Sequence, residues 1–185
     1  MTRHAKQVIA HIPRLRRYAQ ALLRDSDRAE DLVQETLARA LGRMQAWRVG
    51  SNLRAWLFSI MHNQFVNDCR RADRQPDLIG LDQAGAEPAS HLSADSVARL
   101  DDLADALMQL PDQQRATLLL VALEGLSYAE TARVLGVRTG TVMSRLHRAR
   151  ERLRALLDPL GDSADTMPAP AVGDAPEASP LRRIK

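Results

Sequence analysis

The sequence predicts an all-α protein made of two small helical domains joined by a flexible linker. Apolar residues recur every three or four positions over long stretches, and runs of alternating β-branched residues, which are typical of strands, do not occur. Aromatic residues make up 3% of the 185 positions, and 45% are hydrophobic. We expect a first domain at 8–75, a linker at 76–95, a second domain at 96–158 and a disordered tail at 159–185.

Three helices are predicted in the first domain. Pro13 favours a helix start, so the first helix is expected over about 13–24. The second is expected over about 27–44, with Leu41 on its buried stripe, and the third over about 52–71. Together their apolar stripes are expected to close one small core.

This periodicity stops after the third helix. Residues 76–95 contain prolines, glycines and acidic residues, and neither lysine nor arginine occurs among them. This composition is typical of a linker. Periodicity then returns with Leu100 and Leu107, Pro111 starts another helix, and Gly125 ends it. The proline- and alanine-rich end of the chain is predicted to be disordered and is interpreted as vestigial or as a docking peptide.

The most informative motif is a helix-turn-helix between Leu126 and Arg152. Ser127 and Glu130 have the spacing of a capping box, which starts a helix, and Gly136 supplies the turn. The following helix has a buried apolar stripe and an arginine-rich outward face, which suits contact with phosphates and guanine edges. Nucleic acid is therefore the predicted partner, and an ordinary helical hairpin with a solvated charged face is the alternative.

Two further constellations precede the linker. Asp31, Gln34 and Glu35 have i, i+3, i+4 spacing and share one helix surface, which alone is typical of a solvated face. The segment 47–71 combines a glycine-containing loop, two tryptophans and a helix with asparagines and arginines, which suits opened DNA. The alternative for its aromatic residues is the core, and we favour the core for Trp56 and Phe58.

Three motifs in this order resemble the extracytoplasmic-function (ECF) sigma factors of bacterial RNA polymerase, within the sigma-70 family. They are DLVQETLARAL, then WRVGSNLRAWLFSIMHNQFVNDCRR and, after the linker, LPDQQRATLLLVALEGLSYAETARVLGVRTGTVMSRLHRARERL. The match covers about residues 8 to 157. It implies that the two domains are sigma regions 2 and 4, with core RNA polymerase, promoter DNA and an anti-sigma factor as partners.

The resemblance also implies which residues make up each binding site. Core polymerase would be bound by Asp31, Gln34 and Glu35. The minus-ten element would be bound by Arg48, Ser51, Asn52, Asn63, Asn67, Arg70 and Arg71, with a flipped base held by the loop 48–52. The minus-thirty-five duplex would be bound by Thr141, Met143, Ser144, Arg145, His147 and Arg148. Many relatives have a basic residue in place of Met143 and an aromatic one in place of His147, so base preference does not carry over.

Composition and motifs bear on the remaining classes of function. The single cysteine, Cys69, and the five histidines show no metal-ligand spacing, so we expect neither a metal nor a cofactor. Because no apolar run reaches a membrane span and the N-terminus does not resemble a secretory signal, we expect a cytoplasmic protein without membrane insertion. It is predicted to be a monomer when free and not an enzyme, since no phosphate loop or nucleophile elbow occurs.

Two other interpretations remain open at this stage. The first is an autonomous regulator whose helix-turn-helix binds operators as a dimer, although the strands of a receiver domain do not precede it. The second is an adaptor that holds protein or RNA through its polar and basic helices, although RNA binding usually requires more stacking aromatics.

Overall fold

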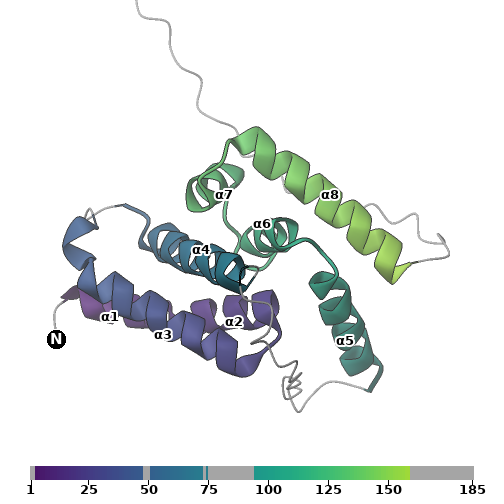
Figure 1. The fold of residues 1–185 in the computed structure, drawn as a ribbon, viewed down its shortest axis with the longest axis horizontal. Helices are drawn as coiled ribbons and strands as arrows, with labels where there is room; N and C mark the ends of the chain where they lie inside the picture. Colours follow the sequence, from purple (N-terminus) through teal and green to yellow (C-terminus); the bar gives the residue numbers. More distant parts are fainter. Residues whose placement is uncertain (1–2, 48–50, 73, 75–93, 159–185) are drawn as a thin grey trace, which may run out of the picture.

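A computed structural model describes residues 3–47, 51–72, 74 and 94–158, and every regular element within them is helical (Figure 1). The elements are α1 (Arg3–Ile9), α2 (Ile12–Leu23), α3 (Ser26–Gly42), the 3₁₀ helix η1 (Met44–Ala46), α4 (Leu53–Ala72), α5 (Ala94–Met108), α6 (Asp112–Ala122), α7 (Tyr128–Leu135) and α8 (Thr139–Leu157). The all-α prediction is confirmed. The predicted tail, and residues 76–93 of the predicted linker, lie outside the described residues.

Local sequence explains several helix ends. The side chain of Asp25 caps α3 by accepting a hydrogen bond of 2.9 Å from the backbone N–H of Arg28. Helix α2 ends at Leu23 and is capped by Arg24, which has a left-handed backbone (φ 51°) and whose N–H bonds to the carbonyl of Gln20. Helix α1 was not predicted, because its seven residues are too few for a periodic signal.

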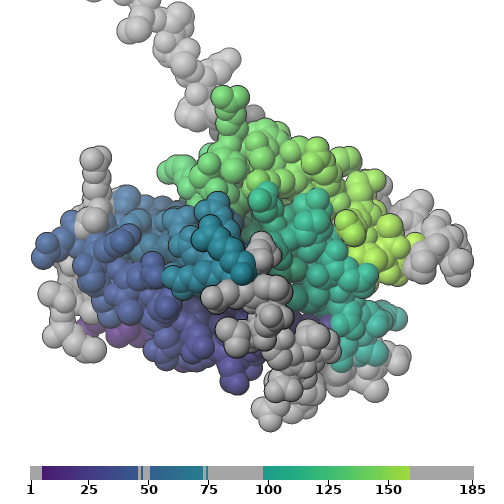
Figure 2. Space-filling model, viewed as in Figure 1, coloured from purple at the N-terminus to yellow at the C-terminus, as the bar shows by residue number. Residues whose placement is uncertain are grey.

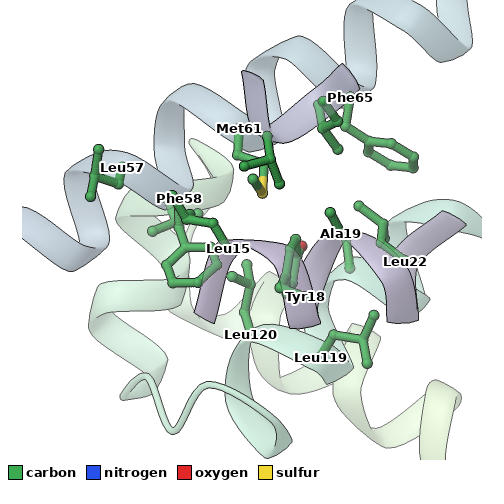
Figure 3. Close-up of a cluster of buried hydrophobic side chains, with 14 of the residues drawn as sticks. Leu15, Tyr18, Ala19, Leu22, Leu57, Phe58, Met61, Phe65, Leu119 and Leu120 are labelled. Atoms are coloured by element: carbon green, nitrogen blue, oxygen red, sulfur yellow. The ribbon is translucent and has the colours of Figure 1, made fainter. Parts of the chain in front are cut away.

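Helices from both halves of the chain share one hydrophobic core. We call α1 to α4 the N-terminal region and α5 to α8 the C-terminal region. Figure 3 shows side chains of α2 and α4 gathered above Leu119 and Leu120 of α6. Within this shared core the rings of Tyr18 and Phe58 meet edge to face, with centroids 5.1 Å apart. In the space-filling view the two regions form one continuous body (Figure 2), an arrangement that the sequence did not predict.

Helix α6 of the C-terminal region packs against both α2 and α8 and so takes part in two hydrophobic clusters (Figure 1). Leu119 and Leu120 belong to the shared core, whereas Leu118 packs with Leu146 in a second cluster within the C-terminal region. Residues 115–120 of α6 are all buried, so this part of the helix is enclosed by neighbours on every side. The buried Arg115 donates hydrogen bonds to the backbone carbonyls of Met108 and Leu110, and its charge is compensated by an ion pair of 2.6 Å with Asp112.

Two leucines predicted to lie on apolar stripes are exposed instead. Leu41 is 55% exposed, because a helix turns about 100° per residue and its neighbour Ala40 is the one that faces the core. Leu100 is 52% exposed, and among the residues of α5 whose burial is described, the first buried one is Ala106 in the last turn.

Candidate nucleic-acid interface

Helices α7 and α8 form the predicted helix-turn-helix. Ser127 Oγ accepts a hydrogen bond of 3.2 Å from the N–H of Glu130, whose carboxylate accepts one of 2.9 Å from the N–H of Ser127. Gly136 ends α7 in the left-handed conformation (φ 65°), and its N–H bonds to the carbonyl of Ala132. A residue with a Cβ is strained at this φ, which is why glycine occupies the turn.

One face of α8 packs on α6 and the other is exposed. Val142, Leu146 and Ala149 are buried, which turns the opposite side of the helix to solvent. The predicted minus-thirty-five residues divide into exposed side chains, Met143, Ser144, His147 and Arg148, and half-buried ones, Thr141 and Arg145. Arg145 donates a hydrogen bond of 2.6 Å to the side chain of Gln113 on α6, so it points partly into its own region.

The predicted minus-ten residues lie along α4 and in the turn before it. The exposed members are Ser51, Asn52, Asn63, Asn67, Arg70 and Arg71, whereas Arg48 lies outside the described residues. Asn52 Oδ1 accepts a hydrogen bond of 3.0 Å from the N–H of Ala55 and so caps α4. Phe58 is buried in the shared core, as predicted, and Trp56 is half-buried against it.

The predicted polymerase-binding residues are brought together beside a cavity. Asp31, Gln34 and Glu35 are exposed, as their helical spacing predicted, and all three line a cavity of about 400 Å³ between α3 and α4. Its apolar lining includes Leu32 and Phe65. The surface therefore combines charged side chains with an apolar hollow, as protein-binding surfaces often do.

A buried carboxylate joins the two regions. Glu124, in the loop after α6, has a fully buried side chain that accepts a hydrogen bond of 2.9 Å from Arg17 and lies 3.8 Å from Arg14, both on α2. Its backbone carbonyl accepts a hydrogen bond of 3.0 Å from Arg54 of α4. Sequence reasoning missed these four residues, although Glu124 is the single charge in the apolar run LLLVALEGL, which could have indicated an unusual environment.

A second carboxylate links the same two regions. The side-chain amide of Asn52, before α4, donates a hydrogen bond of 2.5 Å to Glu130. The backbone hydrogen bond from Ser127 lowers the pKa of Glu130, and the hydrogen bond from Asn52 adds to this effect. Glu130 is therefore ionised at neutral pH while it holds both the helix-turn-helix cap and the turn before α4.

One buried and one half-buried titratable group lie near this interface. Burial, with a contribution from Arg145 of α8, lowers the pKa of His62 on α4 to about 4. Burial, followed by Asp112 of α6, raises the pKa of the Cys69 thiol to about 12. At neutral pH the imidazole is therefore neutral and the thiol is protonated, so Cys69 lacks the thiolate character of a nucleophile.

Comparison with known proteins decides the family. Two family models match, the sigma2 domain of PhyR over residues 8–62 and region 4 of sigma-70 over residues 100–153. The ECF RNA polymerase sigma factor EcfG of Rhodopseudomonas palustris (strain TIE-1) is 41% identical over 154 residues, which are 81% of this chain and 82% of the relative. The chain belongs to the ECF sigma factor family. Its N- and C-terminal regions are thus sigma regions 2 and 4, and it directs RNA polymerase in transcription initiation.

Further relatives agree with this membership. The ECF RNA polymerase sigma factor SigL of Mycobacterium tuberculosis (strain H37Rv) is 38% identical over 156 residues, 82% of this chain and 86% of the relative. The sigma factor RpoE of Bartonella quintana, solved with the anti-sigma factor NepR, matches this ECF sigma factor with a TM-score of 0.73 and 36% identity, covering 83% of this chain and 96% of that one. CnrH, solved with the cytosolic domain of CnrY, matches with a TM-score of 0.61 and 28% identity over 86% and 88%.

Among the described residues, no helix is both long and apolar enough to cross a bilayer.

Proposed function

We propose that this ECF sigma factor engages its partners through three separate surfaces. Asp31, Gln34 and Glu35 on α3 bind core RNA polymerase, the exposed face of α8 binds the minus-thirty-five duplex, and α4 with the turn before it binds the opened minus-ten element. The observation that carries this proposal is that each surface is polar and exposed on a helix whose opposite face builds the core. The protein itself makes and breaks no covalent bond.

The exposed face of α8 has the chemistry of major-groove recognition. Arg148 is able to hold a phosphate or the O6 and N7 atoms of a guanine, and the exposed Met143 offers an apolar surface for a thymine methyl group. The helix has 19 residues and so a length of about 28 Å, which suits insertion along a groove.

The residues of α4 suit DNA whose strands have separated. Asn63 and Asn67 lie one helical turn apart and are both exposed, so their amides are placed to bond to base edges that the duplex would hide. Arg70 and Arg71 follow at the end of the helix, where they are able to hold the flanking phosphates. These residues therefore act at a later step than Arg148.

The α3 surface gives the protein its polymerase partner, and an anti-sigma factor is a further partner. RpoE and CnrH, which match this fold, were solved with NepR and with the cytosolic domain of CnrY. Such a partner would compete with polymerase if it covered the α3 surface. We place the free protein in the cytoplasm as a monomer.

A second candidate function is that of an anti-anti-sigma factor that imitates region 2. It is favoured by the match of residues 8–62 to the sigma2 domain of PhyR, a protein described as an anti-anti-sigma factor. An anti-anti-sigma factor of this kind would not bind promoter DNA, so it would not need a DNA-binding surface on region 4. The exposed basic face of α8 therefore favours the sigma factor.

One experiment tests the main proposal. Core polymerase is mixed with the wild-type protein or with the Asp31→Ala, Gln34→Ala, Glu35→Ala variant, and binding and run-off transcription on genomic fragments are measured. We expect the variant to keep its helicity and to lose core binding and transcription, because these side chains contribute little to the core. The control variant, Asp27→Ala with Arg43→Ala, changes exposed residues at the two ends of α3, outside the cavity.

The outcomes separate the interpretations. Equal binding by wild type and triple variant would show that the polymerase surface lies elsewhere. Failure of the wild-type protein to support transcription, with tight binding to an anti-sigma factor, would favour the imitator. Tight, sequence-specific DNA binding by the free protein would favour an autonomous regulator, because a sigma factor is expected to need polymerase to align its two regions.

A further inference from the structure

The three arginines around Glu124 form a site with an excess of positive charge. Arg14, Arg17 and Arg54 converge from α2 and α4 on one loop, and Glu124 brings a single carboxylate. Its Oε1 accepts a hydrogen bond from Arg17, whereas its buried Oε2 accepts none. One acid therefore neutralises this site only in part, and its hydrogen-bonding capacity is not fully used.

A nearby histidine reports the same positive field. His11 immediately precedes α2, and its pKa is lowered first by partial burial and then by Arg14 and Arg54, while Glu124 opposes this effect. The arginines also remain accessible from one side, since the side chains of Arg14 and Arg17 are 47% and 54% exposed even with Glu124 bound. The site is thus a cationic surface that one buried carboxylate covers.

This cationic site adjoins the predicted minus-ten turn. Arg54 stands two residues after Asn52, the cap of α4, and Asn52 is itself bound to a carboxylate of the C-terminal region, Glu130. Two polar groups of the N-terminal region near the predicted DNA surface therefore have partners in the C-terminal region: Asn52 binds the carboxylate of Glu130, and Arg54 binds the backbone carbonyl of Glu124. Arginine forks and amide donors are the groups that bind DNA phosphates in proteins.

We infer that Arg14, Arg17 and Arg54 form a phosphate-binding site for promoter DNA, and that Glu124 occupies this site when the two regions are packed together. The inference rests on the proposed minus-ten role of the neighbouring turn. It adds three arginines to the DNA surface and makes their binding to DNA and their binding to Glu124 mutually exclusive.

The distance between the two promoter elements requires the two regions to separate, which removes Glu124 from the three arginines. The minus-ten and minus-thirty-five positions differ by roughly 25 base pairs, or about 85 Å of duplex. A compact chain of this size has a radius of gyration of about 16 Å, so the packed form cannot reach both elements. When the regions separate, the arginines are released from Glu124 beside the DNA that the neighbouring turn binds.

The test measures DNA binding by the full chain in the absence of polymerase. The probes are a labelled single-stranded oligonucleotide of mixed sequence and its duplex, over a series of salt concentrations. Glu124→Gln removes the charge that competes with phosphate, and we expect a several-fold gain in affinity for the single strand. Glu30→Gln is the matched control, because Glu30 pairs with Arg16 of the same α2 helix within the N-terminal region.

The deciding comparison is made in the Glu124→Gln background. There, adding Arg14→Ala and Arg17→Ala should lower the affinity and reduce the salt slope by about 0.7 for each phosphate that the variant no longer binds. Arg16→Ala, on the same helix, should change neither. If the added arginine substitutions leave DNA binding at the level of Glu124→Gln alone, the arginines serve only to hold the regions together and the inference is wrong.

A second set of substitutions is available in case the Glu124→Gln variant does not fold. Arg24 pairs with Asp101 and Asp105 of α5 between the same regions, and both acids are largely exposed. Asp101→Asn with Asp105→Asn therefore weakens the packed form without touching the cationic site. Failure of this inference is also distinct from failure of the proposed function, because core binding through α3 and run-off transcription do not depend on the oligonucleotide result.

Discussion

The two surfaces of this ECF sigma factor that we propose to bind DNA differ in their contacts within the protein. On α8 the side chains of Met143, His147 and Arg148 are exposed. On the N-terminal region, Asn52 and Arg54 are bound to the C-terminal region. Under the proposed roles, this difference predicts an order of events. The exposed face of α8 is accessible to duplex DNA in the packed form, whereas the turn before α4 becomes fully accessible only after the regions separate.

The largest expected effect concerns the shared core. Leu120→Ala should lower the free energy of unfolding by about 2–5 kcal/mol, because Leu120 is fully buried and its truncation leaves a cavity. Leu157→Ala, at a 45% exposed position, should change it little. Urea titration followed by helicity and by Trp47 and Trp56 fluorescence checks this. Loss of helicity with unchanged tryptophan unfolding would show that the N-terminal region folds independently of α6.

The next prediction separates the steps at which the two DNA surfaces act. Arg148→Ala should weaken binding of the holoenzyme to the upstream element by about 1–3 kcal/mol if it contacts a base, as measured by footprinting. Asn63→Ala and Asn67→Ala should keep upstream protection and reduce permanganate reactivity of promoter thymines, because they act after strand separation. Arg154→Ala, an exposed arginine paired with Glu151, is the control. Equal loss of upstream protection in all three DNA-facing variants would contradict this division.

Acid should destabilise the packed form through His62. Its pKa is about 4 in the folded protein, against an ordinary value of 6.5, so the unfolded chain binds more protons between these values. The contribution of His62 to the free energy of unfolding is nearly complete at pH 7 and falls as pH drops toward 4, by about 1.2 kcal/mol between pH 7 and pH 5.5. The free energy of unfolding measured between pH 7 and 5.5 checks this. His62→Gln should flatten the dependence, and the exposed His147→Gln should not.

The smallest expected effect concerns the helix-turn-helix cap. Ser127→Ala should cost about 1 kcal/mol of stability, because it removes the side-chain bond to the N–H of Glu130. It should also loosen Glu130, which holds Asn52, so hydrogen exchange at the start of α4 should rise. Ser26→Ala at the exposed first position of α3 is the control. Unchanged exchange at α4 would show that the cap and the turn are not coupled.

Local signals predicted the helices well. Signals for helix ends act on the backbone within a few residues, so the ends that they predict agree closely with the structure. The examples are Pro13, the capping box of Ser127 and Glu130, and Gly136. Alternating buried and exposed positions along α8 were likewise predicted from its period. The exposed setting of Asp31, Gln34 and Glu35 follows from the same geometry.

Pairings between distant segments could not be predicted in this way. Glu124 meets Arg17 across more than a hundred residues, and no period or cap encodes such a pairing. The exposure of Leu100 has the same origin, because a stripe shows which residues of a helix are apolar but not how far its partner extends. The roles of the DNA-facing residues stay predictions, since charge and exposure alone do not identify a bound base.

The shared core has a consequence for synthesis on the ribosome. Leu119 and Leu120, which lie beneath Leu15 and Tyr18 of α2, are translated about a hundred residues later. At bacterial elongation rates this delay is about 5–20 s. During that interval the nascent N-terminal helices display an apolar patch, which makes them a substrate for ribosome-associated chaperones until α6 emerges from the exit tunnel.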